Sequence, residues 1–336
     1  STSSSWLSHC EIYAAQMVAE LGLNNDSFVV ELASNDGYML KNFVGAGIPC
    51  LGIEPTELAA TIAKDNGIDT VIEFFGVETA KLVAKSRGKA DLIIGNNVLA
   101  HVPDIKDFAA GVSVLLEEEG SATFEFPYAR NLFDGNQYDT VYHEHFSYLS
   151  VISTTHLFQS VGLDIYNIEH VPTHGGSLRL FISHRGKKDI QPICDQMLAD
   201  EKKMGLEELP FYLEWAPRVL AHKLEVTSYL IEKAKEGKRV FGYGAAAKGN
   251  TLLNYCGIRR DVIQGIYDNA VSKIGKLSPG SHIPILDPKV SDLTQADVII
   301  IFPWNISEEL LEEIRLHQLK PDVEIVKLIP GVVRLN

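Results

Sequence analysis

Two histidines flank a glutamate in the segment VYHEHFSYLS, residues 141–150, and tyrosines stand on both sides. Three interpretations fit these residue types: a metal site, buried structural histidines, or an acid/base group. A metal site needs three or four ligands at metal-like spacing, and although His101 and His174 could be added, their spacing does not demand it. Histidine titrates near neutral pH, and a neighbouring carboxylate such as Glu144 can orient it and raise its pKa. We therefore favour an acid/base group, and we expect no metal in this chain.

A second polar group follows the first apolar run, in ELASNDGY. Ligands of open parallel sheets sit beyond the carboxyl ends of the strands. The turn has one glycine where a dinucleotide fingerprint has three, and its acidic side chains would repel a pyrophosphate. It suits a ligand with a positive group, such as the amino acid end of S-adenosylmethionine, although a plain turn with a surface acid stays open. The expected cofactor residues are Glu31, Asn35, Asp36, Gly37, Glu54 as an acceptor for ribose hydroxyls, and Asn97.

A second glycine turn, GYGAAAKG, fits the pattern G-x-G-x-x-A through Gly242, Gly244 and Ala247. Asp268 follows about 20 residues later, as the nicotinamide fingerprint requires, so this turn alone would predict a dehydrogenase. Lys248 stands where a helix begins, and there a cation and backbone amides can hold a phosphate together. We expect this turn to hold the diphosphate of NAD or of a sugar nucleotide, with a purely structural turn as the alternative.

The elements that position these groups alternate between strand and helix, which predicts parallel α/β sheets. The expected strands of the first half are Phe28–Leu32, PCLGIEPT, Asp69–Ile72, ADLIIGNNVLAHVP, GSATFEFPY and an antiparallel edge strand in PTHGGSLRLFISHR; the expected helices are 9–22, 56–66, 77–87 and 105–117. Residues 189–236 are rich in charge with helical spacing and predict a helical bridge. A second α/β unit follows it.

Composition limits the class of protein. The 336 residues suggest roughly two domains, and a net charge of −14 makes nucleic acid an unlikely general partner. Four widely spaced cysteines form no CxxC pair, which is typical of a reducing compartment. Because there is no apolar run of membrane length and no signal peptide, we expect a cytoplasmic protein that does not bind membranes. We expect a monomer or a weak homo-oligomer.

Eight segments in this order resemble the S-adenosylmethionine-dependent nucleotide-sugar C-methyltransferases of deoxysugar biosynthesis: VVELASNDGYML, LGIEP, NNVLAHVP, YHEHFSYLS, PTHGGSLR, GYGAAAKGNTLLNY, YDNAVSKIGKLSPGSHIPI and FPWN. The resemblance covers essentially the whole chain. It implies an α/β protein with a class I methyltransferase Rossmann-like domain, a helical bridge and a second Rossmann-like domain. We place the cofactor domain with its catalytic insert at 1–187, and the bridge with a nucleotide-sugar-binding domain at 188–336.

The chain departs from this family at its start. Members usually begin with a small zinc-binding domain that contains paired cysteines, and the segment STSSSWL resembles the part just after that domain. The resemblance thus implies that zinc belongs to a domain absent from this chain. We expect a truncated or disordered N-terminus rather than a natural loss of that domain.

The implied reaction is methylation of the carbon next to the ketone of a nucleotide-linked 4-keto-deoxysugar, with S-adenosylmethionine as cofactor and S-adenosylhomocysteine as product. Carried onto this sequence, His145 is the base, Glu144 orients it or binds a sugar hydroxyl, and Tyr142 and His101 hold the ketone or enolate oxygen. Further expected contacts are Phe74 and Phe75 at the adenine, unless they only pack in the core, and His174, Tyr243, Lys248 and Asp268 at the substrate. Two other functions stay open: a nicotinamide-dependent oxidoreductase that uses the second glycine turn, and a non-catalytic nucleotide-sugar-binding protein.

Overall fold

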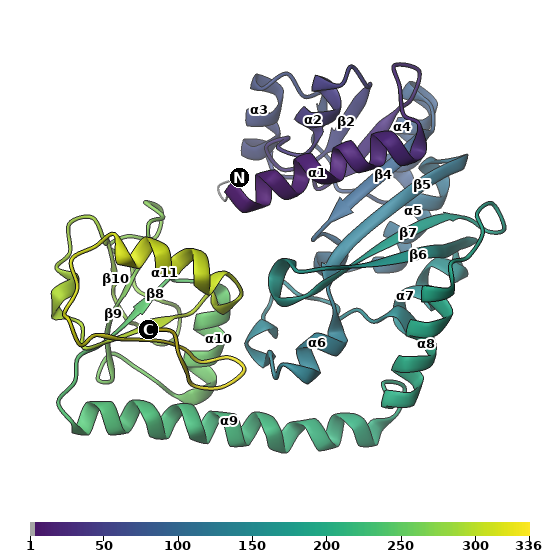
Figure 1. The fold of residues 1–336 in the computed structure, drawn as a ribbon. Helices are drawn as coiled ribbons and strands as arrows, with labels where there is room; N and C mark the ends of the chain where they lie inside the picture. Colours follow the sequence, from purple (N-terminus) through teal and green to yellow (C-terminus); the bar gives the residue numbers. More distant parts are fainter. Residues whose placement is uncertain (1–3) are drawn as a thin grey trace. The chain divides into compact units, whose positions relative to one another are not determined.

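The computed structural model describes residues 4–336, except for the side chains of Ser4, Ser5 and His174. The chain divides into two compact units. Unit 1 contains the chain up to Tyr128 together with Phe146–Pro172 and Gly176–Lys203; unit 2 contains Ala129–His145, Thr173–Gly175 and Met204–Asn336. Figure 1 shows the ribbon of both units and labels many of their helices and strands.

Unit 1 is built on a sheet with the strand order β3-β2-β1-β4-β5-β7-β6. Its strands are β1 (Val29–Leu32), β2 (Cys50–Ile53), β3 (Thr70–Val71), β4 (Ala90–Asn96), β5 (Leu116–Pro127), β6 (Leu163–Val171) and β7 (Ser177–His184). Strands β1 to β5 are parallel, and β7 is antiparallel to both β5 and β6. The sequence predicted β7 as an edge strand. This was wrong, because β6 pairs on its outer side and forms the edge instead.

Helices cover both faces of this sheet. They are α1 (Ser4–Leu21), α2 (Leu40–Gly45), α3 (Glu57–Asp65), α4 (Val77–Arg87), α5 (Ile105–Leu115), α7 (Val151–Ser160) and α8 (Pro192–Met204), with a 3-10 turn η1 (Leu99–His101) after β4. Successive strand residues point to opposite faces, so Val30 and Ile93 join one core while Val29 and Leu92 join the other. A sheet that is buried on both faces explains why Leu92, Ile93 and Ile94 of β4 are apolar in succession.

Unit 2 has a second sheet with the order β10-β9-β8-β11-β12-β13. Its strands are β8 (Val240–Tyr243), β9 (Ile263–Tyr267), β10 (Ile285–Leu286), β11 (Val298–Ile301), β12 (Glu324–Lys327) and the antiparallel β13 (Val333–Arg334). Its helices and 3-10 turns are α6 (Ala129–Asp134), η2 (Tyr138–Thr140), η3 (Thr173–Gly175), α9 (Leu209–Lys235), α10 (Ala247–Cys256), η4 (Leu293–Gln295), η5 (Trp304–Ile306) and α11 (Ser307–Arg315). The two predicted Rossmann-like domains are thereby confirmed.

The unit boundaries differ from the expected division at residue 187. Helix α8 packs with unit 1, whereas 129–145, which contains the histidine–glutamate cluster, folds with unit 2. Tyr138 explains the second difference, because its buried side chain belongs to the core that α9 and α10 form in unit 2. None of the described helices is long and apolar enough to cross a membrane.

Candidate active site

The turn after β1 has the backbone of a glycine-rich loop although it contains a single glycine. Ala33, Asn35 and Gly37 have φ angles of 55°, 52° and 80°, in the left-handed region that glycine adopts most easily. At Gly37 a side chain is also excluded by space, because a Cβ would lie 2.7 Å from Cγ1 of Ile68. The sequence located this turn, but the count of one glycine against three did not reveal its backbone conformation, in which alanine and asparagine occupy two of the left-handed positions.

Glu54 ties this loop to the next helix. It is buried just after β2, where its Oε2 accepts the N–H of Asn35 at 3.0 Å and its Oε1 accepts the N–H of Thr56 at 2.8 Å. Each carboxylate oxygen has a second lone pair. Glu54 can therefore hold the loop and still has lone pairs for another donor, and its contact with a ribose hydroxyl stays a prediction.

Buried polar groups collect at the carboxyl ends of β1 and β4. Glu31 is 2% exposed, and its Oε2 has no hydrogen-bond partner among the described residues. Burial, and then the negative charges of Asp36 and Glu54, raise the pKa of Glu31 well above its usual 4.5. Within the described part of the chain, Ser34 Oγ and both amide atoms of Asn96 also lack partners. Since buried polar groups are normally hydrogen bonded, this edge offers donors and acceptors that fit a polar, positively charged ligand.

Asn96 is a residue that the sequence reasoning missed. The sequence pointed to its neighbour Asn97, which adopts a φ of 54° and donates its N–H to the carbonyl of Glu125 at 2.7 Å. Asn96, the last residue of β4, is the buried one with an unpartnered side chain. The NN pair at the strand end was the available signal, but it did not indicate which asparagine is buried.

The two phenylalanines that were expected at the adenine differ in burial. Phe75 is half-buried and packs edge-to-face on Phe108, with ring centroids 5.2 Å apart, so it belongs to the core. Phe74 is 80% exposed. A contact between Phe74 and the adenine stays a prediction.

The histidine–glutamate cluster is a tight turn. The His145 N–H donates to the carbonyl of Tyr142 at 3.0 Å, and the two rings lie against each other with centroids 4.4 Å apart. His143 and Glu144, at the tip, are exposed, while Tyr142 and His145 are half-buried. Of these four polar residues, the turn therefore brings Tyr142 and His145 into contact.

His145 is oriented by the main chain. Its Nδ1 lies 3.0 Å from the carbonyl oxygen of Thr140. A carbonyl only accepts, so Nδ1 carries the proton and the lone pair of the neutral ring is on Nε2. The sequence predicted that Glu144 orients His145 or binds a sugar hydroxyl; the structure shows the carbonyl of Thr140 at Nδ1, and the role of Glu144 stays a prediction. Thr140 could not have been recognised from the sequence, because the group that acts is its backbone carbonyl.

The segment that follows the turn is fixed to unit 1. The N–H groups of Phe146 and Ser147 donate to the carbonyl of Ala100 at 2.8 and 3.2 Å. Ala100 precedes His101 in η1, directly after β4. His174 lies in η3 by its backbone, and its side chain is outside the described residues. Among the His, Cys, Asp and Glu side chains that the structure describes, which exclude that of His174, no three gather as metal ligands would.

The second glycine turn is packed by the chain itself. A Cβ at Gly242 would collide with the ring of Phe302, and one at Gly244 would lie 2.5 Å from Cδ of Pro303. Tyr243 is a core residue whose hydroxyl donates to Glu313. The two oxygens of Asp268 accept the N–H groups of Ala245 and Ala270, both at 2.7 Å. These contacts favour the structural alternative for the glycines, and the diphosphate contacts of Tyr243 and Asp268 stay predictions.

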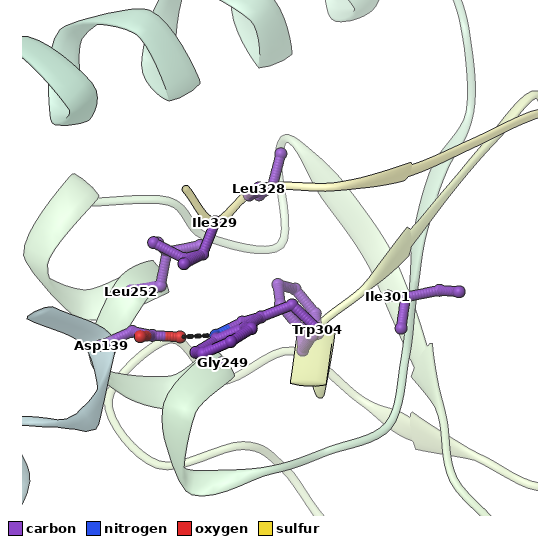
Figure 2. A pocket seen from close by; sticks show the side chains of 8 residues that line it. Asp139, Gly249, Leu252, Ile301, Trp304, Leu328 and Ile329 are labelled. Carbon is purple, nitrogen blue, oxygen red and sulfur yellow. Dashed lines mark hydrogen bonds between the residues drawn. The ribbon is translucent and has the colours of Figure 1, made fainter. Parts of the chain in front are cut away.

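Lys248 lies over the indole of Trp304, 4.4 Å from the ring centroid, and donates to Asn305 Oδ1 at 2.8 Å. Burial lowers the pKa of Lys248 to about 8, although the negative charge of Asp139 acts to raise it. Burial likewise raises the pKa of Asp139 to about 6. Figure 2 shows the small, mainly apolar pocket in which Asp139 and Trp304 meet.

A comparison with known proteins decides the family. The chain is 35% identical to the C-methyltransferase NovU of Streptomyces niveus over 296 residues. The matched region covers 88% of this chain and 70% of NovU. The chain belongs to the C-methyltransferase family. Of the functions considered from its sequence, the chain has that of an S-adenosylmethionine-dependent methyltransferase.

Family models divide the C-methyltransferase in two. A methyltransferase domain matches residues 8–168, and a C-methyltransferase C-terminal domain matches 172–330. Among solved structures, it is similar to magnesium protoporphyrin IX methyltransferase of Synechocystis with bound SAM, with 14% identity, TM-score 0.40, and coverage of 53% and 79% of the two chains. A S-adenosylmethionine-dependent methyltransferase of Clostridium acetobutylicum has 12% identity, TM-score 0.42, and coverage of 52% and 91%. These two similarities assign no function to any residue of this chain.

Proposed function

We propose that this C-methyltransferase methylates the carbon next to the ketone of a nucleotide-linked 4-keto-deoxysugar, with His145 as the base. The observation that carries the proposal is the hydrogen bond from His145 Nδ1 to the Thr140 carbonyl, because it leaves Nε2 as the basic atom. A C–H beside a ketone becomes acidic once the enolate oxygen is stabilised. We assign that stabilisation to Tyr142, which lies against His145, and to His101.

The cofactor supplies an electrophilic methyl group when bound. In our proposal the left-handed turn and Glu54 bind its nucleoside end, while Glu31 and Asn96 meet its polar, positive end. His145 removes the proton, and the carbon so activated is the one that is methylated. The sugar nucleotide is supported by the family resemblance and by a second Rossmann-like sheet, where Lys248 stands near the start of α10.

The substrate class is tested by incubating the protein with S-adenosylmethionine and a panel of 4-keto nucleotide sugars. We expect mass spectrometry to show the gain of one methyl group, and fragmentation to place it on a sugar carbon. The corresponding nucleotide sugars with a 4-hydroxyl are the matched control, because without a ketone the C–H is not acidic. Equal methylation of both sets, or methylation on oxygen, would contradict the proposed reaction.

Glu31 is expected to lose a proton when S-adenosylmethionine binds. Its pKa in the free protein is raised well above 4.5, so the carboxyl is protonated between pH 4.5 and that raised pKa. A positive group beside it favours the carboxylate. Affinity should therefore rise with pH through this window and level off above it. Calorimetry in two buffers of different ionisation enthalpy measures the released proton, and Glu31→Gln should abolish it. An affinity for S-adenosylmethionine that does not change across this pH window would mean that the positive group of the cofactor does not contact Glu31.

A further inference from the structure

The FPWN segment has a contact that the proposed reaction does not yet use. Indole Nε1 of Trp304 donates to Asp139 Oδ2 at 2.8 Å, across 165 residues of sequence, and Figure 2 shows this hydrogen bond. Asp139 is 2% exposed. A buried hydrogen bond to a carboxyl oxygen is costly to remove, because it leaves the acceptor without a partner. Trp304 therefore fixes the position of Asp139.

Asp139 lies in η2, next to the residue that orients the base. The carbonyl oxygen of Thr140 accepts a hydrogen bond from Nδ1 of His145. The same residue is held internally, since its N–H and its hydroxyl both donate to the carbonyl of Gln137, at 3.0 and 2.8 Å. The path from the Trp304 indole to the His145 ring thus runs through one buried side chain and one short, hydrogen-bonded turn.

Trp304 also contacts η3, a second segment of unit 2 that lies in the sequence between two segments of unit 1. Its ring packs so closely on Gly175 in η3 that a Cβ there would collide with it. Gln137 Nε2 donates to the Gly175 carbonyl at 3.2 Å. One indole therefore holds both η2 and η3, and unit 2 supplies the support for the turn that carries His145.

The start of η2 has a separate anchor. His222 Nε2 donates to the carbonyl of Leu328 at 2.6 Å, so its Nδ1 accepts the hydroxyl of Tyr138 at 2.9 Å. Tyr138 would keep η2 attached if the Trp304 bond were lost. A variant at Trp304 is therefore expected to disturb the orientation of the turn rather than to detach it.

We propose that Trp304 is a positioning residue for catalysis: through Asp139 it fixes the Thr140 carbonyl that holds His145 in its Nδ1-protonated tautomer. This rests on the proposed role of His145 as base. Trp304 acts through hydrogen-bond donation and Asp139 as an acceptor. The acceptor needs an oxygen and not a charge, so Asp139→Asn should preserve the contact, whereas Asp139→Ala and Trp304→Phe should break it.

The test has two readouts on the full chain. Imidazole ¹⁵N NMR of histidine-labelled protein without ligands reports the tautomer of His145, with its signal assigned by its loss in His145→Gln. Steady-state methyl transfer to dTDP-4-keto-6-deoxyglucose, or to the best substrate of the panel, gives kcat and KM. Tyr229→Phe is the matched control, because it removes a hydroxyl hydrogen bond to Glu324 in the same unit that involves no residue of η2.

We expect Trp304→Phe and Asp139→Ala to mix the tautomers of His145 and to lower kcat by about 10-fold to 100-fold, with KM changed by less than about threefold. Asp139→Asn and Tyr229→Phe should resemble the parent in both readouts. Should Trp304→Phe not fold, the Asp139→Ala and Asp139→Asn pair gives the same comparison. A parent protein with His145 protonated on Nε2, or variants that keep both tautomer and kcat, would overturn the proposal. If the tautomers shift as expected but the parent methylates no keto sugar, the proposed function fails while the positioning role stands.

Discussion

His145→Gln is expected to lower kcat for methyl transfer by about 10²-fold to 10⁴-fold, which corresponds to about 3 to 5 kcal/mol of activation free energy. Glutamine keeps a side chain of similar reach, but it has no basic nitrogen to take the proton. Nδ1 of His145 is bound to the Thr140 carbonyl, so the loss falls on the Nε2 atom that we assign as the base. The measurement is steady-state kinetics with the substrate found in the panel.

The neighbouring histidine supplies the control. His143 is exposed at the tip of the same turn, so His143→Gln should keep kcat within about twofold of the parent. Cofactor affinity, measured by calorimetry with S-adenosylhomocysteine, should be unchanged in both variants, since the cofactor is assigned to other residues. Full turnover in His145→Gln would remove this residue from the mechanism, and equal losses in both variants would point to a general effect on the turn.

Glu54→Ala is expected to weaken S-adenosylhomocysteine binding by about 100-fold. The carboxylate accepts N–H groups from both Asn35 and Thr56, and hydrogen bonds to a charged acceptor contribute about 1.5 to 3 kcal/mol each. The change leaves both donors unpaired and releases the left-handed loop, in addition to removing the proposed ribose contact. Calorimetry measures the dissociation constant, and thermal unfolding separates the loss of affinity from a loss of fold.

Two further variants make this result specific. Glu54→Gln keeps one accepting oxygen and should lie between the parent and Glu54→Ala. Glu57, in the first turn of α3, is exposed and has no part in the loop, so Glu57→Ala should bind as the parent does. Normal affinity in Glu54→Ala would show that this loop does not bind the cofactor.

The sequence by itself determined the alternation of strands and helices and the place of both turns, although it did not predict α7 or β6. Alternating apolar runs and helical spacing are local signals, and they predicted the strands on either side of ELASNDGY and GYGAAAKG. The resemblance of eight ordered segments also indicated the family that the comparison with NovU established. These conclusions needed no knowledge of which distant residues meet.

Only the tertiary structure decided which atoms in each turn are buried and which are hydrogen bonded. The left-handed angles at Ala33 and Asn35, the burial of Asn96 and the carbonyl of Thr140 depend on backbone conformation, which residue types do not specify uniquely. The glycines of the second turn are explained by Phe302 and Pro303, and Asp139 by Trp304, all through contacts across more than 50 residues of sequence. Such contacts carry no periodic signal along the chain, because they arise when separate segments pack together. For the same physical reason, the turn of His145 could be located from sequence as a candidate, but its membership in unit 2 could not.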